Sequence, residues 1–126
     1  MKESYFQTKL KEDLENEGYL VWIISDRFTK GIPDVYAAKD GEEYWLELKV
    51  INKTGKIHLA DWEASAHRFT KAQAIKLYQL QQKGVNAFGV CYLAPDKKII
   101  TVQPEEMENT LDYSELKEYP EFTLLE

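Results

Sequence analysis

From Gly31 to Val50 the chain reads GIPDVYAAKDGEEYWLELKV, two β-prone runs joined by Asp40-Gly41. Asp-Gly between such runs is the strongest short signal for a β-hairpin with a two-residue turn. Counting outward from that turn, each residue of the first run pairs with one of the second. Asp34 is then expected directly opposite Glu47.

Two opposed carboxylates are an unusual pair, because directly opposed side chains share a face of the sheet with Cβ atoms about 4.5–5.5 Å apart. Their mutual repulsion becomes attraction when a divalent cation lies between them. Lys49 belongs to the same face, since strand side chains alternate, whereas Leu46 and Leu48 point toward the core with Val35. The charged trio therefore predicts a functional site. The alternative is an ordinary ion pair of Lys49 with one acid, the other acid being solvated at a sheet edge.

The composition is that of one globular domain: 126 residues, 44% hydrophobic and 30% charged. Cys91 is the single cysteine and lies in an apolar run, so we expect a buried, inert thiol in the reducing cytoplasm, with neither a disulfide nor a cysteine-based zinc site. The sequence has no secretory leader and no apolar run of membrane-spanning length, so we expect no membrane association. It also lacks the glycine-rich phosphate-binding motifs, so no nucleotide cofactor is expected.

Charge is distributed unevenly along the chain. Residues 1–103 carry 15 Lys/Arg against 14 Asp/Glu, whereas residues 104–126 carry one Lys against eight acids. We therefore expect a core of residues 1–103 and an acidic extension, 104–126, packed on or beside the same domain. The extension could serve dimerisation or shield a basic face. Six Lys/Arg between Lys49 and Lys76 form a cationic segment able to hold a polyanion.

Hydrophobic periodicity predicts an α/β fold. A helix is expected over residues 3–17, with a stripe of Phe6, Leu10 and Leu14, and a second helix from Thr70 to Gly84. Strands are expected at 19–24, in the hairpin, at 86–93 and at 97–102, whereas 51–69 reads as a long functional loop. A right-handed crossover places residues 86–93 parallel to 43–50. The expected product is a mixed sheet with a helix on each side.

These motifs resemble the PD-(D/E)XK nuclease superfamily, most closely small VRR-NUC nucleases and bacterial Holliday junction resolvases, over roughly residues 1–93. Pro33-Asp34 matches the first half of the signature and Glu47-Leu48-Lys49 the second, with Gly31 as the small residue before Pro-Asp. Glu3 and Gln73 match the polar residues that many members carry in their first and second helices. The resemblance implies a restriction-endonuclease-like αβββαβ core.

The resemblance also implies chemistry. Asp34, Glu47 and the main-chain carbonyl of Leu48 are expected to bind Mg²⁺, with Mn²⁺ as a substitute, and Glu3 to reach the metal through water or to anchor a second ion. Lys49 is expected to hold the attacking water and offset phosphoryl charge. The expected activity is a DNA endonuclease that acts on branched or flapped DNA and leaves a 5′-phosphate and a 3′-hydroxyl. Cutting both strands requires a homodimer. The expected setting is the cytoplasm of a bacterial or phage-infected cell.

Several of these residues have a structural alternative. Gln73 fits a capping box with Thr70, and Glu3 could simply meet the dipole of its helix. His58 and His67 read as solvated loop residues rather than phosphate contacts. Trp62 and Phe69 are expected to pack the loop onto the core rather than to stack on a base.

Candidate contacts to the DNA backbone are the basic residues on either side of the hairpin and before the second helix, namely Arg27, Lys30, Lys53, Lys56, Arg68 and Lys71. The alternative function is a non-catalytic nucleic-acid-binding or assembly module that keeps the same fold. The intact Asp34, Glu47 and Lys49 favour the enzyme.

Overall fold

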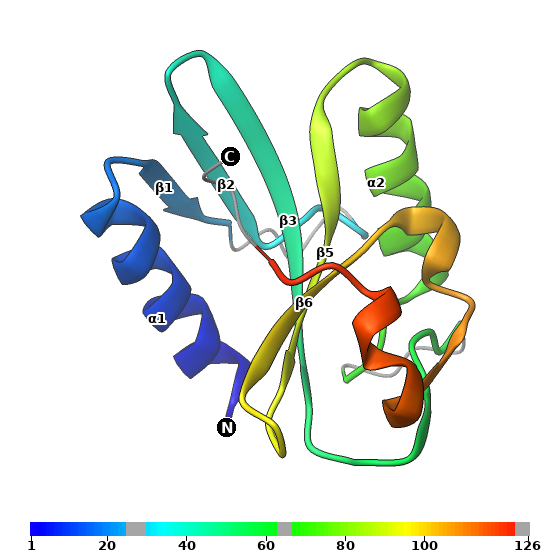
Figure 1. Ribbon diagram of the computed structural model, residues 1–126. Coiled ribbons are helices and arrows are strands. Elements are labelled where there is room, and N and C mark those ends of the chain that lie inside the picture. Colours follow the sequence, from blue (N-terminus) through cyan, green and yellow to red (C-terminus); the bar gives the residue numbers. More distant parts are fainter. Residues whose placement is uncertain (25–29, 63–66, 123–126) are drawn as a thin grey trace.

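The computed structural model describes residues 1–24, 30–62 and 67–122 (Figure 1). The elements along the chain are α1 (Glu3–Asn16), β1 (Leu20–Ile23), β2 (Val35–Lys39), β3 (Glu42–Ile51), β4 (Lys56–His58), α2 (Lys71–Gln82), β5 (Asn86–Leu93), β6 (Lys98–Val102), the 3₁₀ helix η1 (Pro104–Glu106), β7 (Thr110–Asp112) and the 3₁₀ helix η2 (Tyr113–Glu118). With β4 set aside, the elements from α1 to β5 follow the αβββαβ arrangement that the sequence predicts.

The central sheet has the strand order β1-β2-β3-β5-β6, in which only the β3–β5 pair is parallel. Tyr44 of β3 pairs with Asn86 and Ile51 pairs with Leu93, as the predicted crossover through α2 requires. Figure 1 shows α1 and α2 on opposite sides of this sheet. The prediction of a mixed sheet with a helix on each side is confirmed.

The β2–β3 hairpin has the register that the Asp-Gly turn predicts, from Lys39↔Glu42 through Tyr36↔Trp45 to Val35↔Leu46. Asp40 and Gly41 both have positive φ, 52° and 83°, as a type I′ turn requires. Asp34 immediately precedes Val35, so it enters the sheet at the position that faces Glu47.

Each face of the sheet has its own core. The α1 stripe packs on the apolar side chains that alternate along β2 and β3, including Val35, Ala37, Leu46 and Leu48. The α2 side is filled by Leu77 of α2, by residues of the central strands, and by residues of the segments before α2 and after β6. Among them are Ile51, Phe69, Ala87, Cys91, Met107 and Leu111. Cys91 is fully buried, as predicted, and burial raises the pKa of its thiol to about 12.

Two short strands were not predicted. β4 lies within the stretch that the sequence marks as a loop, and it pairs with β7 in a separate two-stranded sheet. Ile57 and Leu111 are buried where these strands pair, so the segment after residue 103 shares the α2-side core. Within the described residues, no helix has the length and apolarity needed to cross a membrane.

Candidate metal centre

A fork between β2 and β3 creates the site. Pairing of the two strands ends at Val35↔Leu46, whereas β3 continues for five more residues alongside β5 alone. Beyond the fork, the Leu48 N–H has no β2 carbonyl opposite it and donates instead to Asp34 Oδ2, at 2.9 Å. This bond fixes the Asp34 carboxyl group against β3.

Three carboxylates converge at the fork. Glu3, Asp34 and Glu47 each offer an oxygen, and these oxygens lie within 4.8 Å of one another. They come from the first turn of α1, the residue before β2 and the middle of β3. Glu47 is 1% exposed, whereas Glu3 and Asp34 are half-buried, so the cluster opens toward solvent on their side.

Lys49 lies beside this cluster, as strand alternation predicts. Its Nζ is 3.7 Å from Glu47 Oε2, and its side chain is almost completely buried. Burial raises the pKa of the Glu47 carboxyl well above its usual value, the neighbouring Asp34 carboxyl raises it further, and the charge of Lys49 lowers it. One lysine therefore does not neutralise the cluster.

Glu3 belongs to the same electrostatic system. Burial raises the pKa of Glu3 to about 7, the Lys49 charge opposes this rise, and the Asp34 charge adds to it. The structure thus brings the Glu3 carboxyl close to those of Asp34 and Glu47. Its role at a metal stays a prediction.

The donor set fits a hard divalent cation. Glu47 Oε1 is buried and has no hydrogen-bond partner among the described residues, an arrangement that costs about 1–3 kcal/mol unless something binds there. Carboxylate oxygens are the ligands that Mg²⁺ and Mn²⁺ prefer. Since the two main-chain groups of a strand residue point to the same side, the Leu48 carbonyl also faces the side of Asp34.

Gly31 holds the Pro33-Asp34 segment against α2. Its φ is +84°, and a Cβ there would lie 2.5 Å from the Ala72 carbonyl oxygen and 3.0 Å from Lys76 Cγ. Only glycine tolerates both the left-handed backbone and this close approach. The position of Asp34 thus depends on contact between the loop before β2 and the second helix.

Gln73 occupies the capping box that the sequence offers as its alternative role. The side-chain oxygen of Gln73 accepts from the main-chain N–H of Thr70 at 2.9 Å, and the main-chain N–H of Gln73 donates to Thr70 Oγ1 at 3.2 Å. The oxygen of this side chain is therefore engaged at the start of α2. A catalytic role for Gln73 stays a prediction.

Part of the predicted basic surface forms a groove. One pocket, of about 370 Å³, is lined by Val50, Lys53, His67 and Arg68, and a second, of about 390 Å³, by Lys53, Lys56, His58 and Arg68 with other residues. Lys53 and Arg68 line both pockets, so the two pockets together form one cationic depression. Its lining includes Val50, which follows Lys49 in the sequence. Asp61 also lines its second part.

The remaining predicted contacts are scattered. Lys30 is exposed before Gly31, whereas Lys71 lines a different pocket together with Glu105 and Glu108. Arg27 lies outside the described residues. Phe69 is buried in the core, as expected, and Trp62 remains 39% exposed. His58 and His67 are both exposed, and the His58 ring nitrogen lies 3.1 Å from Thr110 Oγ1.

A row of aromatic side chains crosses β1, β2 and β3, a feature to which the sequence interpretation gives no role. Trp22 pairs with Tyr36, and Tyr36 pairs with Trp45. Successive ring centroids are 5.1 and 5.0 Å apart. The hairpin register already predicts the Tyr36–Trp45 pair. The sequence does not predict that Trp22 is 55% exposed, which only the structure shows.

Two solved structures resemble this one. A Holliday junction resolvase from the archaeal hyperthermophile Archaeoglobus fulgidus, Hjc, matches with a TM-score of 0.65 and 17% identity, over 94% of this chain and 93% of the other. A VRR_NUC domain matches with a TM-score of 0.53 and 20% identity, over 75% of this chain and 87% of the other. Neither a family model nor a curated protein matches the sequence.

Both neighbours have nuclease-type folds of the PD-(D/E)XK kind, and the match to Hjc spans nearly the whole of both chains. At this level of identity the likeness concerns the fold and does not transfer a substrate or a residue role. The protein therefore shares the fold of these two structures, and the resemblance of its Pro33-Asp34 and Glu47-Leu48-Lys49 motifs to the PD-(D/E)XK signature agrees with that fold.

Proposed function

We propose that this protein is a divalent-metal-dependent nuclease that hydrolyses phosphodiester bonds of DNA. The observation that carries the proposal is the convergence of Glu3, Asp34 and Glu47 within 4.8 Å, beside the buried Lys49, at the fork of β2 and β3. Structural ion pairs rarely bury more acids than bases, because uncompensated buried charge is strongly unfavourable. A cation site explains the excess of acids.

Asp34 and Glu47 would hold the metal directly, together with the Leu48 carbonyl, and Glu3 would hold it through water or anchor a second ion. Mg²⁺ suits these ligands, and Mn²⁺ would substitute for it. Such an ion supplies Lewis-acid polarisation of the phosphoryl group and a lowered pKa for water.

Lys49 contributes the other charge that the reaction needs. Its ammonium group is positioned by the Glu47 carboxylate, 3.7 Å away, and is withdrawn from bulk water. A fixed positive charge in a water-poor site stabilises negative charge that develops on phosphoryl oxygens. Attack by water on phosphorus, with departure of the 3′-oxygen, leaves a 5′-phosphate and a 3′-hydroxyl.

The cationic depression gives the DNA backbone a path to this centre. Lys53, Lys56 and Arg68 line it, and its lining includes Val50, the residue that follows Lys49 in β3. Contacts of this kind neutralise phosphates without reading bases, so binding should weaken steeply with salt. We propose that the preferred substrate is branched or flapped DNA, recognised by shape, and that a homodimer cuts paired strands.

The test is a cleavage assay with labelled junction, flap and duplex DNA in the presence of Mg²⁺, Mn²⁺ or EDTA. Asp34→Asn should abolish metal-dependent cleavage, whereas Asp40→Asn, an exposed acid in the turn of the same hairpin, should cleave like the wild type. Absence of cleavage by the wild type on every substrate would reject the enzyme. Retained DNA binding would then favour a non-catalytic binding module.

A further inference from the structure

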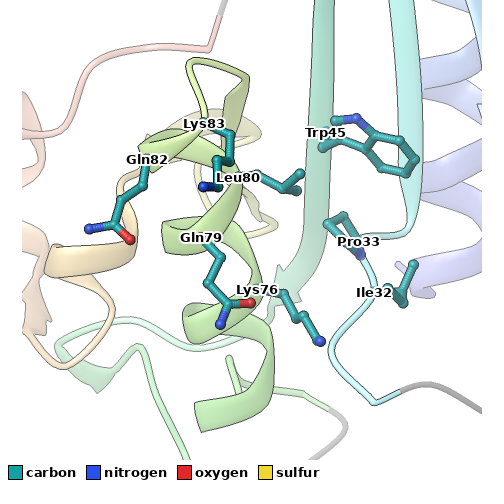
Figure 2. A pocket seen from close by; sticks show the side chains of 8 residues that line it. All are labelled: Ile32, Pro33, Trp45, Lys76, Gln79, Leu80, Gln82 and Lys83. Atoms are coloured by element: carbon teal, nitrogen blue, oxygen red, sulfur yellow. The ribbon is translucent and has the colours of Figure 1, made fainter.

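A pocket of about 480 Å³ lies between α2 and the strands of the hairpin (Figure 2). Its apolar walls are Ile32 and Pro33 from the loop before β2, Trp45 from β3 and Leu80 from α2. In Figure 2 the Leu80 side chain points across the pocket toward the Trp45 ring. The volume lies within the range of small-molecule sites.

This pocket adjoins the candidate metal centre without sharing its residues. Pro33 lines the pocket and is bonded directly to Asp34. Lys76, also in the lining, packs its Cγ close to Gly31, the residue that holds this loop against α2. The pocket and the metal centre therefore adjoin along the loop that leads into β2.

The aromatic row continues from the pocket to the edge of the sheet. Trp45 forms one wall, Tyr36 lies 5.0 Å beyond it and Trp22 a further 5.1 Å. Trp22 is more than half exposed on β1, the edge strand of the sheet. The Tyr36 hydroxyl donates to Glu43 at 2.6 Å, so one carboxylate borders the aromatic row at Tyr36.

The polar part of the lining is cationic. Lys76 and Lys83 border the pocket with glutamine side chains, and no carboxylate is among the residues that line it in the described chain. An apolar cavity with two ammonium groups at its border suits an aromatic ring that carries a phosphate nearby. Stacking platforms combined with positive charge are the general means of binding single-stranded nucleic acid.

We propose that this pocket takes one unpaired nucleobase of the DNA strand under cleavage, stacked on Trp45, and that the strand continues across Tyr36 and Trp22. The proposal rests on the proposed nuclease function and narrows its substrate class to DNA with a single-stranded segment next to the cut phosphate. A second copy of this chain fits the same face less well, because lysines are depleted at interface cores.

The test measures binding without cleavage, by fluorescence anisotropy of labelled oligodeoxythymidine and of a matched duplex in EDTA. Trp45→Leu, which keeps apolar bulk in the pocket, should weaken single-strand binding about 5- to 150-fold, the range for loss of one stacked base. Binding of the duplex should be unchanged. Tyr78→Ser is the control, since Tyr78 is a half-exposed α2 residue outside this pocket.

A second variant protects the test against misfolding of Trp45→Leu. Trp22→Ser changes a largely exposed residue and should also weaken single-strand binding, while circular dichroism shows the native fold. Equal single-strand affinity of both folded variants and the wild type would overturn the proposal. The proposal would also be overturned if light scattering showed that the wild type is a dimer and that Trp22→Ser makes it a monomer without changing its DNA affinity.

A flap substrate identifies the base itself. An abasic site at the unpaired nucleotide beside the cut should lower affinity by the same factor as Trp45→Leu, and combining the two changes should cause no further loss. Additive losses would overturn the proposal. Cleavage lost only in Asp34→Asn, with no dependence on Trp45, would reject the pocket and keep the nuclease. If the wild type cleaves nothing but its DNA binding depends on Trp45, the result would reject the nuclease and keep the pocket.

Discussion

Glu47→Gln should stabilise the metal-free protein, although Glu47 is among its most deeply buried residues. Repulsion of Glu47 by Asp34 and by Glu3, at distances within 4.8 Å, is at least about 3.5 kcal/mol each with an effective dielectric constant of about 20. Attraction to Lys49 at 3.7 Å is about 4.5 kcal/mol on the same scale. The repulsions exceed the attraction, so we expect the variant to gain about 2–3 kcal/mol when all groups are ionised.

The sign of the pH dependence follows from the raised pKa of Glu47. A group whose pKa is higher in the folded state favours folding below its unfolded pKa and loses that contribution as pH rises through the folded value. The stability of wild type in EDTA should thus fall relative to Glu47→Gln as the pH rises above the usual carboxyl pKa of 4.5. Near pH 5 the two proteins should differ little, because Glu47 is already protonated.

Metal should reverse the order of stability. A ligand at about 100 times its Kd stabilises the folded state by about 2.7 kcal/mol, and the variant lacks a ligand for it. Urea unfolding followed by tryptophan fluorescence measures the free energy of unfolding of the wild type and of Glu47→Gln, each in EDTA and in Mg²⁺. A wild type that is the more stable protein in EDTA at about pH 8 would refute the reasoning.

Four further substitutions test other parts of the site. Gly31→Ala should destabilise the fold by at least about 1–2 kcal/mol, from the left-handed backbone alone, and should lower the cleavage rate by displacing the loop from Ala72. Urea unfolding and the cleavage assay measure these two effects, and wild-type stability together with wild-type activity would contradict the prediction. Lys49→Met should lower the cleavage rate about 10²–10³-fold while Mg²⁺ still stabilises the protein in thermal unfolding; an unaffected rate would remove Lys49 from the mechanism. Thr70→Ala and Gln73→Ala should each lower the free energy of unfolding by about 1 kcal/mol. Loss of cleavage in Gln73→Ala but not in Thr70→Ala, at equal stability, would give Gln73 a catalytic role beyond capping.

The hairpin is predictable from sequence because its information is local. Asp40 and Gly41 adopt the positive φ angles of the turn, and the turn alone sets the register up to Asp34. The placement of Glu47 and Lys49 on one face follows from strand alternation. No long-range contact is needed for either inference.

The second sheet and the pocket are not predictable in this way. β4 and β7 have three residues each, with one buried side chain apiece, so neither has a measurable period, and they pair across a long stretch of the chain that contains α2, β5 and β6. The pocket joins Pro33, Trp45 and Leu80 from three separate elements. Side-chain convergence of this kind depends on how the elements pack.

The central claim is that the carboxylates at the β2–β3 fork bind a divalent cation together. Isothermal titration calorimetry of the metal-free protein with Mn²⁺ tests it most directly, with Asp34→Asn and Glu47→Gln as variants and Asp40→Asn as the matched control. Saturable binding by wild type and control, lost in both variants, is the predicted result. Binding absent from the wild type, or unchanged in the two variants, would contradict the account.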